Sequence, residues 1–78
     1  MRWGTRYHPD AIAAIYRIER GTAALVTEAI RQLGRNPRPP DSQELPDRVN
    51  TYSIEPAGHL VVYELLESER IVHVMFIG

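Results

Sequence analysis

Hydrophobic and polar residues alternate along four segments of the chain, and a period of two residues is typical of a half-buried β-strand. The first segment spans residues 1–7, where Trp3, Thr5 and Tyr7 fall on one side. The other three follow one another near the C-terminus, at about residues 49–55, 59–66 and 70–77. The pattern therefore predicts one strand at the start of the chain and three consecutive strands at its end.

Two segments between these strands follow the helical period instead. In the first, residues 8–21, Pro9 suits the first helical position, Asp10 complements the positive helix start, and Gly21 is expected to end the helix. Thr22 is expected to cap a second helix over residues 23–34, which makes an αα-hairpin. The predicted buried stripes are Ala11, Ile12, Ala14, Ile15 and Ile18 in the first helix and Leu25, Val26, Ala29, Ile30 and Leu33 in the second.

The segment of residues 35–48, RNPRPPDSQELPDR, holds four of the six prolines and has no periodicity, which predicts a long loop. The resulting order of elements is β-α-α-β-β-β. It predicts an α+β fold in which the helical hairpin packs on a small, mainly antiparallel sheet. At 78 residues the chain has room for a single domain, which we expect to span residues 1–78.

The last connection, residues 67–69, sets the register of the two final strands. A symmetric loop there pairs Leu66 with Ile71 and so places Glu64 beside His73. The face that we expect to pack on the helices then carries Tyr52, Ile54, Val61, Tyr63, Leu65, Val72, Val74 and Phe76. The outward face carries Thr51, Ser53, Glu55, Leu60, Val62, Glu64, Leu66, Ile71, His73, Met75 and Ile77. Its apolar content is high for a surface that meets only water.

Composition narrows the class of protein. The chain has no cysteine, which excludes disulfides and thiolate metal sites. It shows neither the apolar run of a signal peptide nor a stretch long enough to span a membrane, so we expect a soluble cytoplasmic protein. Residues 1–39 hold seven arginines and three acids, whereas residues 40–78 hold two arginines and seven acids. An acidic C-terminal half has the wrong sign for a nucleic-acid site in that half.

The order of elements, the hairpin ending in LGRNPRPP and above all the segment TYSIEPAGHLVVYELLESERIVHVMFIG resemble the RelE/ParE superfamily of toxins from toxin–antitoxin modules. The resemblance implies a cognate antitoxin as partner. For RelE-type members it also implies cleavage of messenger RNA on the ribosome, where a ribose 2′-hydroxyl attacks the neighbouring phosphate with help from basic groups. For the ParE branch it implies action on DNA gyrase without RNA cleavage.

The sequence departs from the family at the positions that carry this RNA chemistry. The two basic positions of the family's strand are Ser53 and Glu55 here, and the family's Gly-Tyr-Arg turn reads Gly58-His59-Leu60. The sequence stops at Gly78, before the family's basic and aromatic tail. Loss of one donor to a developing negative charge lowers the rate of such a reaction by about 10²–10³-fold. We therefore expect the standard ribonuclease chemistry to be absent.

The catalytic residues are unknown, and three side chains remain as candidates. Glu64 and His73 form the best acid–base pair, because the predicted register sets them side by side; as a plain ion pair they are worth about 0.2–1 kcal/mol. His59 lies in the turn, and the alternative to a catalytic role is an ordinary, half-exposed side chain. A site built from His59, His73 and a carboxylate matches no zinc motif, so we expect no metal and no cofactor.

The outward face offers a surface for a partner protein. Its candidate binding residues are Ser53, Glu55, Leu60, Val62, Leu66, Met75 and Ile77. The arginines of the first half are a solvated surface or a contact for RNA. Four hypotheses stay open: a messenger-RNA endonuclease that uses Glu64 and His73, a toxin with a protein target such as DNA gyrase, a lapsed toxin that still binds its antitoxin, and a self-associating module, for example a homodimer, with no toxin role.

Overall fold

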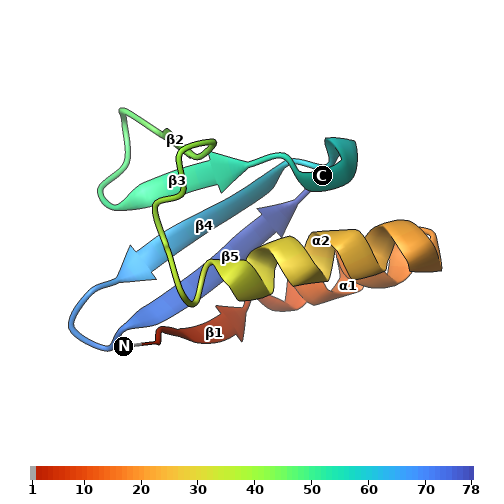
Figure 1. The fold of residues 1–78 in the computed structure, drawn as a ribbon, viewed down its shortest axis with the longest axis horizontal. Helices are drawn as coiled ribbons and strands as arrows, with labels where there is room; N and C mark the ends of the chain where they lie inside the picture. The colour runs from red at the N-terminus through yellow and green to blue at the C-terminus, as the bar shows by residue number, and fades with distance from the viewer. Residues whose placement is uncertain (1) are drawn as a thin grey trace.

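Residues 2–78 of the protein are described from a computed structural model, in which two helices lie on one side of a five-stranded sheet (Figure 1). The elements are β1 (Gly4–Tyr7), α1 (Pro9–Arg17), α2 (Arg20–Gln32), β2 (Gln43–Glu44), β3 (Thr51–Ile54), the short 3₁₀ helix η1 (Pro56–Gly58), β4 (Val61–Leu66) and β5 (Ile71–Ile77). The strand order is β1-β5-β4-β3-β2, with β1 parallel to β5 and the other pairs antiparallel. The predicted α+β fold is confirmed; Met1, where the first strand was expected to begin, lies outside the described residues.

The helical hairpin turns at a different residue from the one predicted. α1 ends at Arg17, and Glu19 is the N-cap of α2, where its carboxylate accepts hydrogen bonds from the backbone N–H groups of Gly21 at 2.9 Å and Thr22 at 3.0 Å. These bonds lower the pKa of Glu19 and satisfy two N–H groups that the first helical turn leaves free. The predictions that Gly21 stops the first helix and that Thr22 caps the second are therefore wrong.

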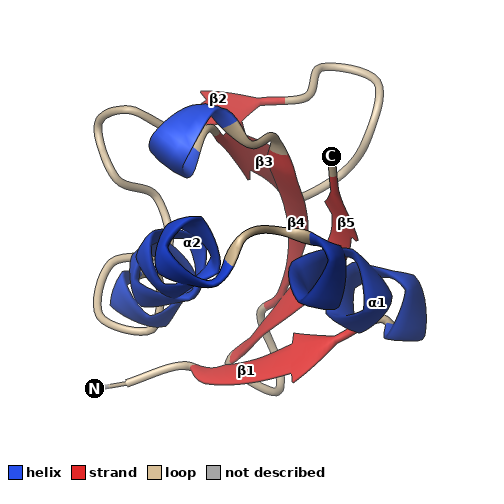
Figure 2. Cartoon of the chain, turned by 90° about the vertical axis from the view of Figure 1, so that its right-hand side faces the viewer, coloured by secondary structure: helices blue, strands red, loops and turns tan. Residues whose placement is uncertain are grey.

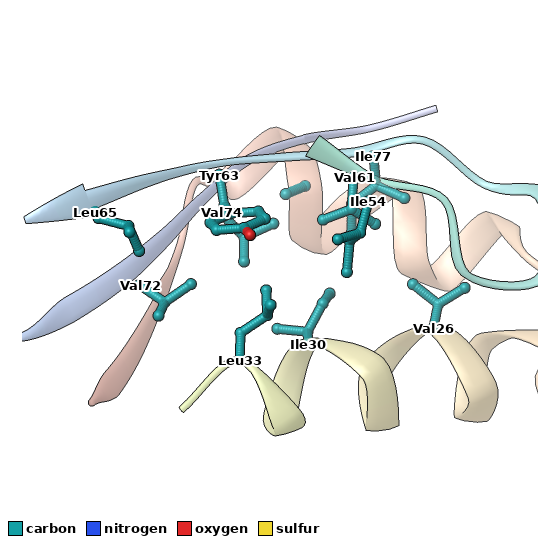
Figure 3. Packing of buried hydrophobic residues seen from close by; sticks show 11 residues of the cluster. Val26, Ile30, Leu33, Ile54, Val61, Tyr63, Leu65, Val72, Val74 and Ile77 are labelled. Atoms are coloured by element: carbon teal, nitrogen blue, oxygen red, sulfur yellow. The ribbon is translucent and has the colours of Figure 1, made fainter. Parts of the chain in front are cut away.

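The core lies between α2 and the inner face of the sheet, as Figure 3 shows. Val26, Ile30 and Leu33 of α2 are almost fully buried against Tyr63 and the aliphatic side chains around it. Two residues of the predicted stripes are instead exposed, Ile12 at 43% and Leu25 at 62%. Each stands one position away from a fully buried residue, which rotates it by roughly 100° around the helix axis and away from the sheet.

The proline-rich segment is not entirely a loop. Residues 43 and 44 form β2, which pairs with Ser53 and Tyr52 of β3 and is one edge of the sheet. The segment is also held by side chains, because the Tyr63 hydroxyl donates a hydrogen bond to the Pro37 carbonyl at 2.8 Å, and the Arg38 guanidinium contacts both Tyr52 and Glu67. The expectation of a plain loop over residues 35–48 is therefore wrong at β2.

The register of the last two strands is confirmed over most of their length and then shifts. Leu66 pairs with Ile71 and Glu64 with His73, as predicted. Beyond Tyr63, which pairs with Val74, Val62 pairs with Phe76, so Met75 is an extra residue of β5. Such a β-bulge reverses which side the following residues face.

The bulge corrects two assignments. Phe76, predicted to face the helices, is 50% exposed, whereas Ile77, predicted to face outward and to bind a partner, is 5% exposed in the core. Ile77 is therefore removed from the candidate binding residues, and Phe76 takes a place on the outward side. A third outward residue, Thr51, pairs with Glu64 but is only 2% exposed, and its hydroxyl donates a hydrogen bond to the Val49 carbonyl at 3.0 Å.

Candidate partner-binding face of the sheet

Figure 2 shows the sheet and its two helices from one end, and the side of the sheet that faces away from the helices is called the outer face below. It carries a group of apolar side chains that keep contact with solvent. Leu60 is 37% and Phe76 is 50% exposed, and the others are half-buried. Strand pairing sets Val62 opposite both Ser53 and Phe76, and Leu66 opposite Ile71. The outer face therefore brings together the predicted binding residues Ser53, Leu60, Val62, Leu66 and Met75, and adds Ile71 and Phe76 to them.

A polar row crosses the middle of this face. Glu64 of β4 pairs with His73 of β5, which in turn pairs with Arg6 of β1. The His73 Nδ1 atom lies 3.6 Å from Glu64 Oε1, and Arg6 Nη2 lies 3.3 Å from Glu69 Oε1. The predicted Glu64–His73 proximity is thus confirmed, at a separation that is long for a hydrogen bond.

Arg6 was not among the candidate site residues. The alternation of residues 1–7 already put it on the side away from Trp3, Thr5 and Tyr7. The sequence did not indicate which strand lies beside the first one, because no short turn joins two parallel strands that are far apart in the chain. Chemically, the row offers a carboxylate, an imidazole and a guanidinium within adjacent strands.

The positions at which the resemblance calls for basic residues lie together in the structure. Ser53, Glu55 and Leu60 line one hollow of about 180 Å³ at the end of β3, and its other lining residues are Asp41, Gln43 and Ile54. Two carboxylates and no basic side chain line this hollow. Sequence reasoning missed Asp41, because it lies in the irregular part of the proline-rich segment. The arrangement is suited to a cation and not to a phosphate.

His59 lies away from the other two candidates. It follows η1, in which Ala57 and Gly58 adopt positive φ angles of 53° and 81°. Its Nδ1 atom donates a hydrogen bond to the Gly78 carbonyl at 3.0 Å, and the ring lines a hollow beside Arg17 of α1. Within residues 2–78 no three histidine, aspartate or glutamate side chains are grouped closely enough to hold a metal ion.

The helices of the described chain, residues 2–78, are too short or too polar to cross a membrane.

Comparison with known proteins finds likeness in structure and not in sequence. No protein-family model and no curated protein matches the chain. Among solved structures, the intact E. coli RelBE toxin–antitoxin complex is similar over 97% of this chain and 94% of its own, with a TM-score of 0.87 and 15% identity. The RelBE2 toxin–antitoxin complex from Mycobacterium tuberculosis is similar over 99% and 96%, with a TM-score of 0.83 and 19% identity.

A third similar structure is a double-arginine mutant of E. coli toxin RelE in the free state, with a TM-score of 0.87 and 16% identity over 100% of this chain and 83% of its own. Likeness at this level of identity establishes the fold. The chain has the fold of the RelE toxins, and the predicted RelE/ParE architecture is confirmed.

Proposed function

We propose that this RelE-fold chain is the toxin-like component of a toxin–antitoxin module, and that it acts in the cytoplasm by binding proteins and not by the standard cleavage of messenger RNA. One observation carries the proposal: Ser53, Glu55 and Leu60 line a single hollow with Asp41 where the resemblance calls for basic groups. Further support comes from the similar structures, two of which are complexes of a toxin with its antitoxin.

The charge of this hollow works against RNA cleavage. A phosphodiester is already negative, and attack on its phosphorus adds negative charge in the transition state, which enzymes stabilise with cations and hydrogen-bond donors. Glu55 and Asp41 place carboxylates there, which repel the phosphate and raise the barrier. Replacing donors by an acid and a leucine therefore removes the standard chemistry and leaves the fold intact.

Binding of a protein is favoured by the apolar side chains of the outer face. Phe76 and Leu60 remain exposed, and they adjoin half-buried Val62 and Met75 on neighbouring strands. Covering apolar surface gains about 25 cal/mol for each Å² removed from water. A contiguous apolar surface of this kind is typical of a partner interface.

The proposal is tested by inducing the chain alone and together with a short protein encoded beside it. We expect the two proteins to copurify, and we expect messenger RNA from cells that make the chain alone to stay intact in primer-extension assays. Cut messages contradict the proposal. Growth arrest with intact messages and stalled DNA replication assigns a gyrase-like target, whereas a chain that only self-associates in sedimentation belongs to a module without a toxin role.

A second function, RNA cleavage by a non-standard pair, is favoured by one distance. Glu64 and His73 lie 3.6 Å apart, so one could take a proton from a 2′-hydroxyl while the other gives a proton to the leaving oxygen. If this pair is catalytic, His73→Ala abolishes cleavage of a ribosome-bound message and changes the free energy of unfolding by less than about 1 kcal/mol. His8→Asn is the control, because it changes a histidine outside the sheet and keeps an acceptor for the Asp10 N–H group, and cleavage by His73→Ala equal to that by the control rejects the pair.

A further inference from the structure

Charged residues are segregated between the elements of this fold. β1 and the helices come from the part of the chain with seven arginines and three acids, whereas β2 to β5 come from the part with two arginines and seven acids. On the outer face, Arg6 forms an ion pair with Glu69, so the charges of these two side chains offset each other. In the described part of the chain, residues 2–78, Glu64 forms no ion pair with an arginine, and its ion-pair neighbour is His73 at 3.6 Å.

The acidic hollow at the end of β3 adjoins the outer face, because Ser53 and Leu60 belong to both. Within residues 2–78, neither Asp41 nor Glu55 has an ion pair or a hydrogen bond to a basic side chain. Arg35 shares with Asp41 the neighbouring hollow beneath α2 but makes no ion pair with it. Leu60 gives the acidic hollow an apolar wall that is 37% exposed. A hollow with one apolar wall and two carboxylates matches an arginine or lysine side chain, whose stem is apolar and whose head is cationic.

We propose that the outer face binds a basic amphipathic segment of the partner protein. In this complex, apolar side chains of the segment cover Val62 and Phe76. An arginine or lysine of the segment packs its stem on Leu60 and places its head between the carboxylates of Asp41 and Glu55. This inference rests on the proposed function, since the partner is the antitoxin proposed above, and it adds the sign of charge that the antitoxin carries where it meets the sheet.

Charge complementarity decides between the possible occupants. An acidic segment or an RNA strand brings negative charge to two carboxylates, which opposes association at short range. A second copy of this chain related by a two-fold axis presents the same patch, so it brings its own Asp41 and Glu55 to the interface. A basic segment is the occupant whose charge and apolar side chains both fit the face.

The test uses a displayed library of amphipathic helical segments, in which lysine, arginine, aspartate and glutamate are equally frequent at the polar positions. Segments are selected on the full chain, and the selected segments are then titrated by fluorescence anisotropy. We expect enrichment of lysine and arginine, affinity that falls as salt is raised, and binding at least about tenfold weaker to the double variant Asp41→Asn/Glu55→Gln. The control variant, Glu44→Gln/Asp47→Asn, changes the net charge by the same amount outside the hollow and should bind like the wild type.

Three results overturn the inference: enrichment of acidic segments, no enrichment of either charge, or equal loss of affinity in both double variants. The same variants are also tested with the antitoxin of the preceding section. If Asp41→Asn/Glu55→Gln binds that antitoxin as tightly as the wild type does, the inference fails while the proposed function stands. If the wild type binds basic segments but no antitoxin, the proposed function fails and the charge preference of the face stands.

Discussion

Tyr63 shows at the scale of one residue how the proline-rich segment is fixed to the sheet. Its ring is fully buried and stacks on Tyr52, with 6.0 Å between the ring centroids. Its hydroxyl donates a hydrogen bond to the Pro37 carbonyl, and Arg38 lies over the Tyr52 ring while it contacts the Tyr52 hydroxyl and Glu67. Two tyrosines on adjacent strands thus anchor the start of a segment that is otherwise irregular.

Burial raises the pKa of Tyr63 from its ordinary value of 10.0 to about 12. Between these values the unfolded chain loses the phenol proton and the folded chain keeps it, so stability is full below pH 10 and falls as pH rises toward 12. We expect Tyr63 to account for a loss of about 2–3 kcal/mol across this range, measured by urea unfolding.

Tyr63→Phe should remove most of this dependence at alkaline pH, although the lost hydrogen bond to Pro37 lowers stability at neutral pH by about 1 kcal/mol. The control is Tyr16→Phe, because the Tyr16 side chain is 84% exposed. An alkaline slope in Tyr63→Phe equal to that in Tyr16→Phe contradicts the assignment.

Sequence patterning found these tyrosines but not their partners. Alternation along the strands placed Tyr52 and Tyr63 on the inner face, because each strand there is regular. Arg38 and Pro37 lie in a segment without periodicity, so nothing in the sequence indicated which strand they would reach. Asp41 was missed for the same physical reason, and with it half of the charge in the acidic hollow.

At the scale of elements, the β-bulge at Met75 is the feature that most changes the candidate site. The apolar alternation of Val72, Val74 and Phe76 looks regular in the sequence, and no glycine or proline marks an extra residue. Ile77 lies in the core because the end of β5 pairs with Val61 of β4 and packs near α1. Tertiary packing, and not a local preference, selects this register.

The bulge makes a prediction about two adjacent substitutions. Ile77→Ala should lower the free energy of unfolding by about 2–4 kcal/mol, because it removes buried methyl groups from a packed core. Phe76→Ala should cost less than about half of that, since half of the ring is already in water. Chemical denaturation of both variants measures the two losses of unfolding free energy. A larger loss for Phe76→Ala than for Ile77→Ala is the result expected for strands without a bulge.

At the scale of the whole molecule, pattern and resemblance together predicted the architecture well. Long, periodic segments gave the helices and the last three strands, and the resemblance gave their assembly. The candidate site was predicted less completely, because it depends on which distant residues become neighbours. The pairing of Glu64 with His73 could be predicted, because one short turn joins their strands. Arg6 lies beside His73 because β1 pairs with β5, and these strands are far apart in the sequence.

We expect the chain to unfold as one unit, because a single core joins both helices to β3, β4 and β5. Trp3 packs against that core, so its fluorescence reports tertiary structure, while circular dichroism reports the helices. The two melting curves should coincide, and calorimetry should give an unfolding enthalpy of about 50 kcal/mol, equal to the van't Hoff value. Separate transitions contradict the expectation of one domain.

The parallel pairing of β1 with β5 has a consequence for how the protein is made. Gly4 pairs with Ile71, so β1 finds its neighbour only after the residues between these two strands have been synthesised, on the order of 10 s later. During this wait the inner sides of β1 and both helices have no sheet to cover them, and such pairings between distant segments form slowly. Removal of β5 should therefore harm the yield of folded protein more than removal of the edge strand β2, because β5 pairs with both β1 and β4, whereas β2 pairs with β3 alone.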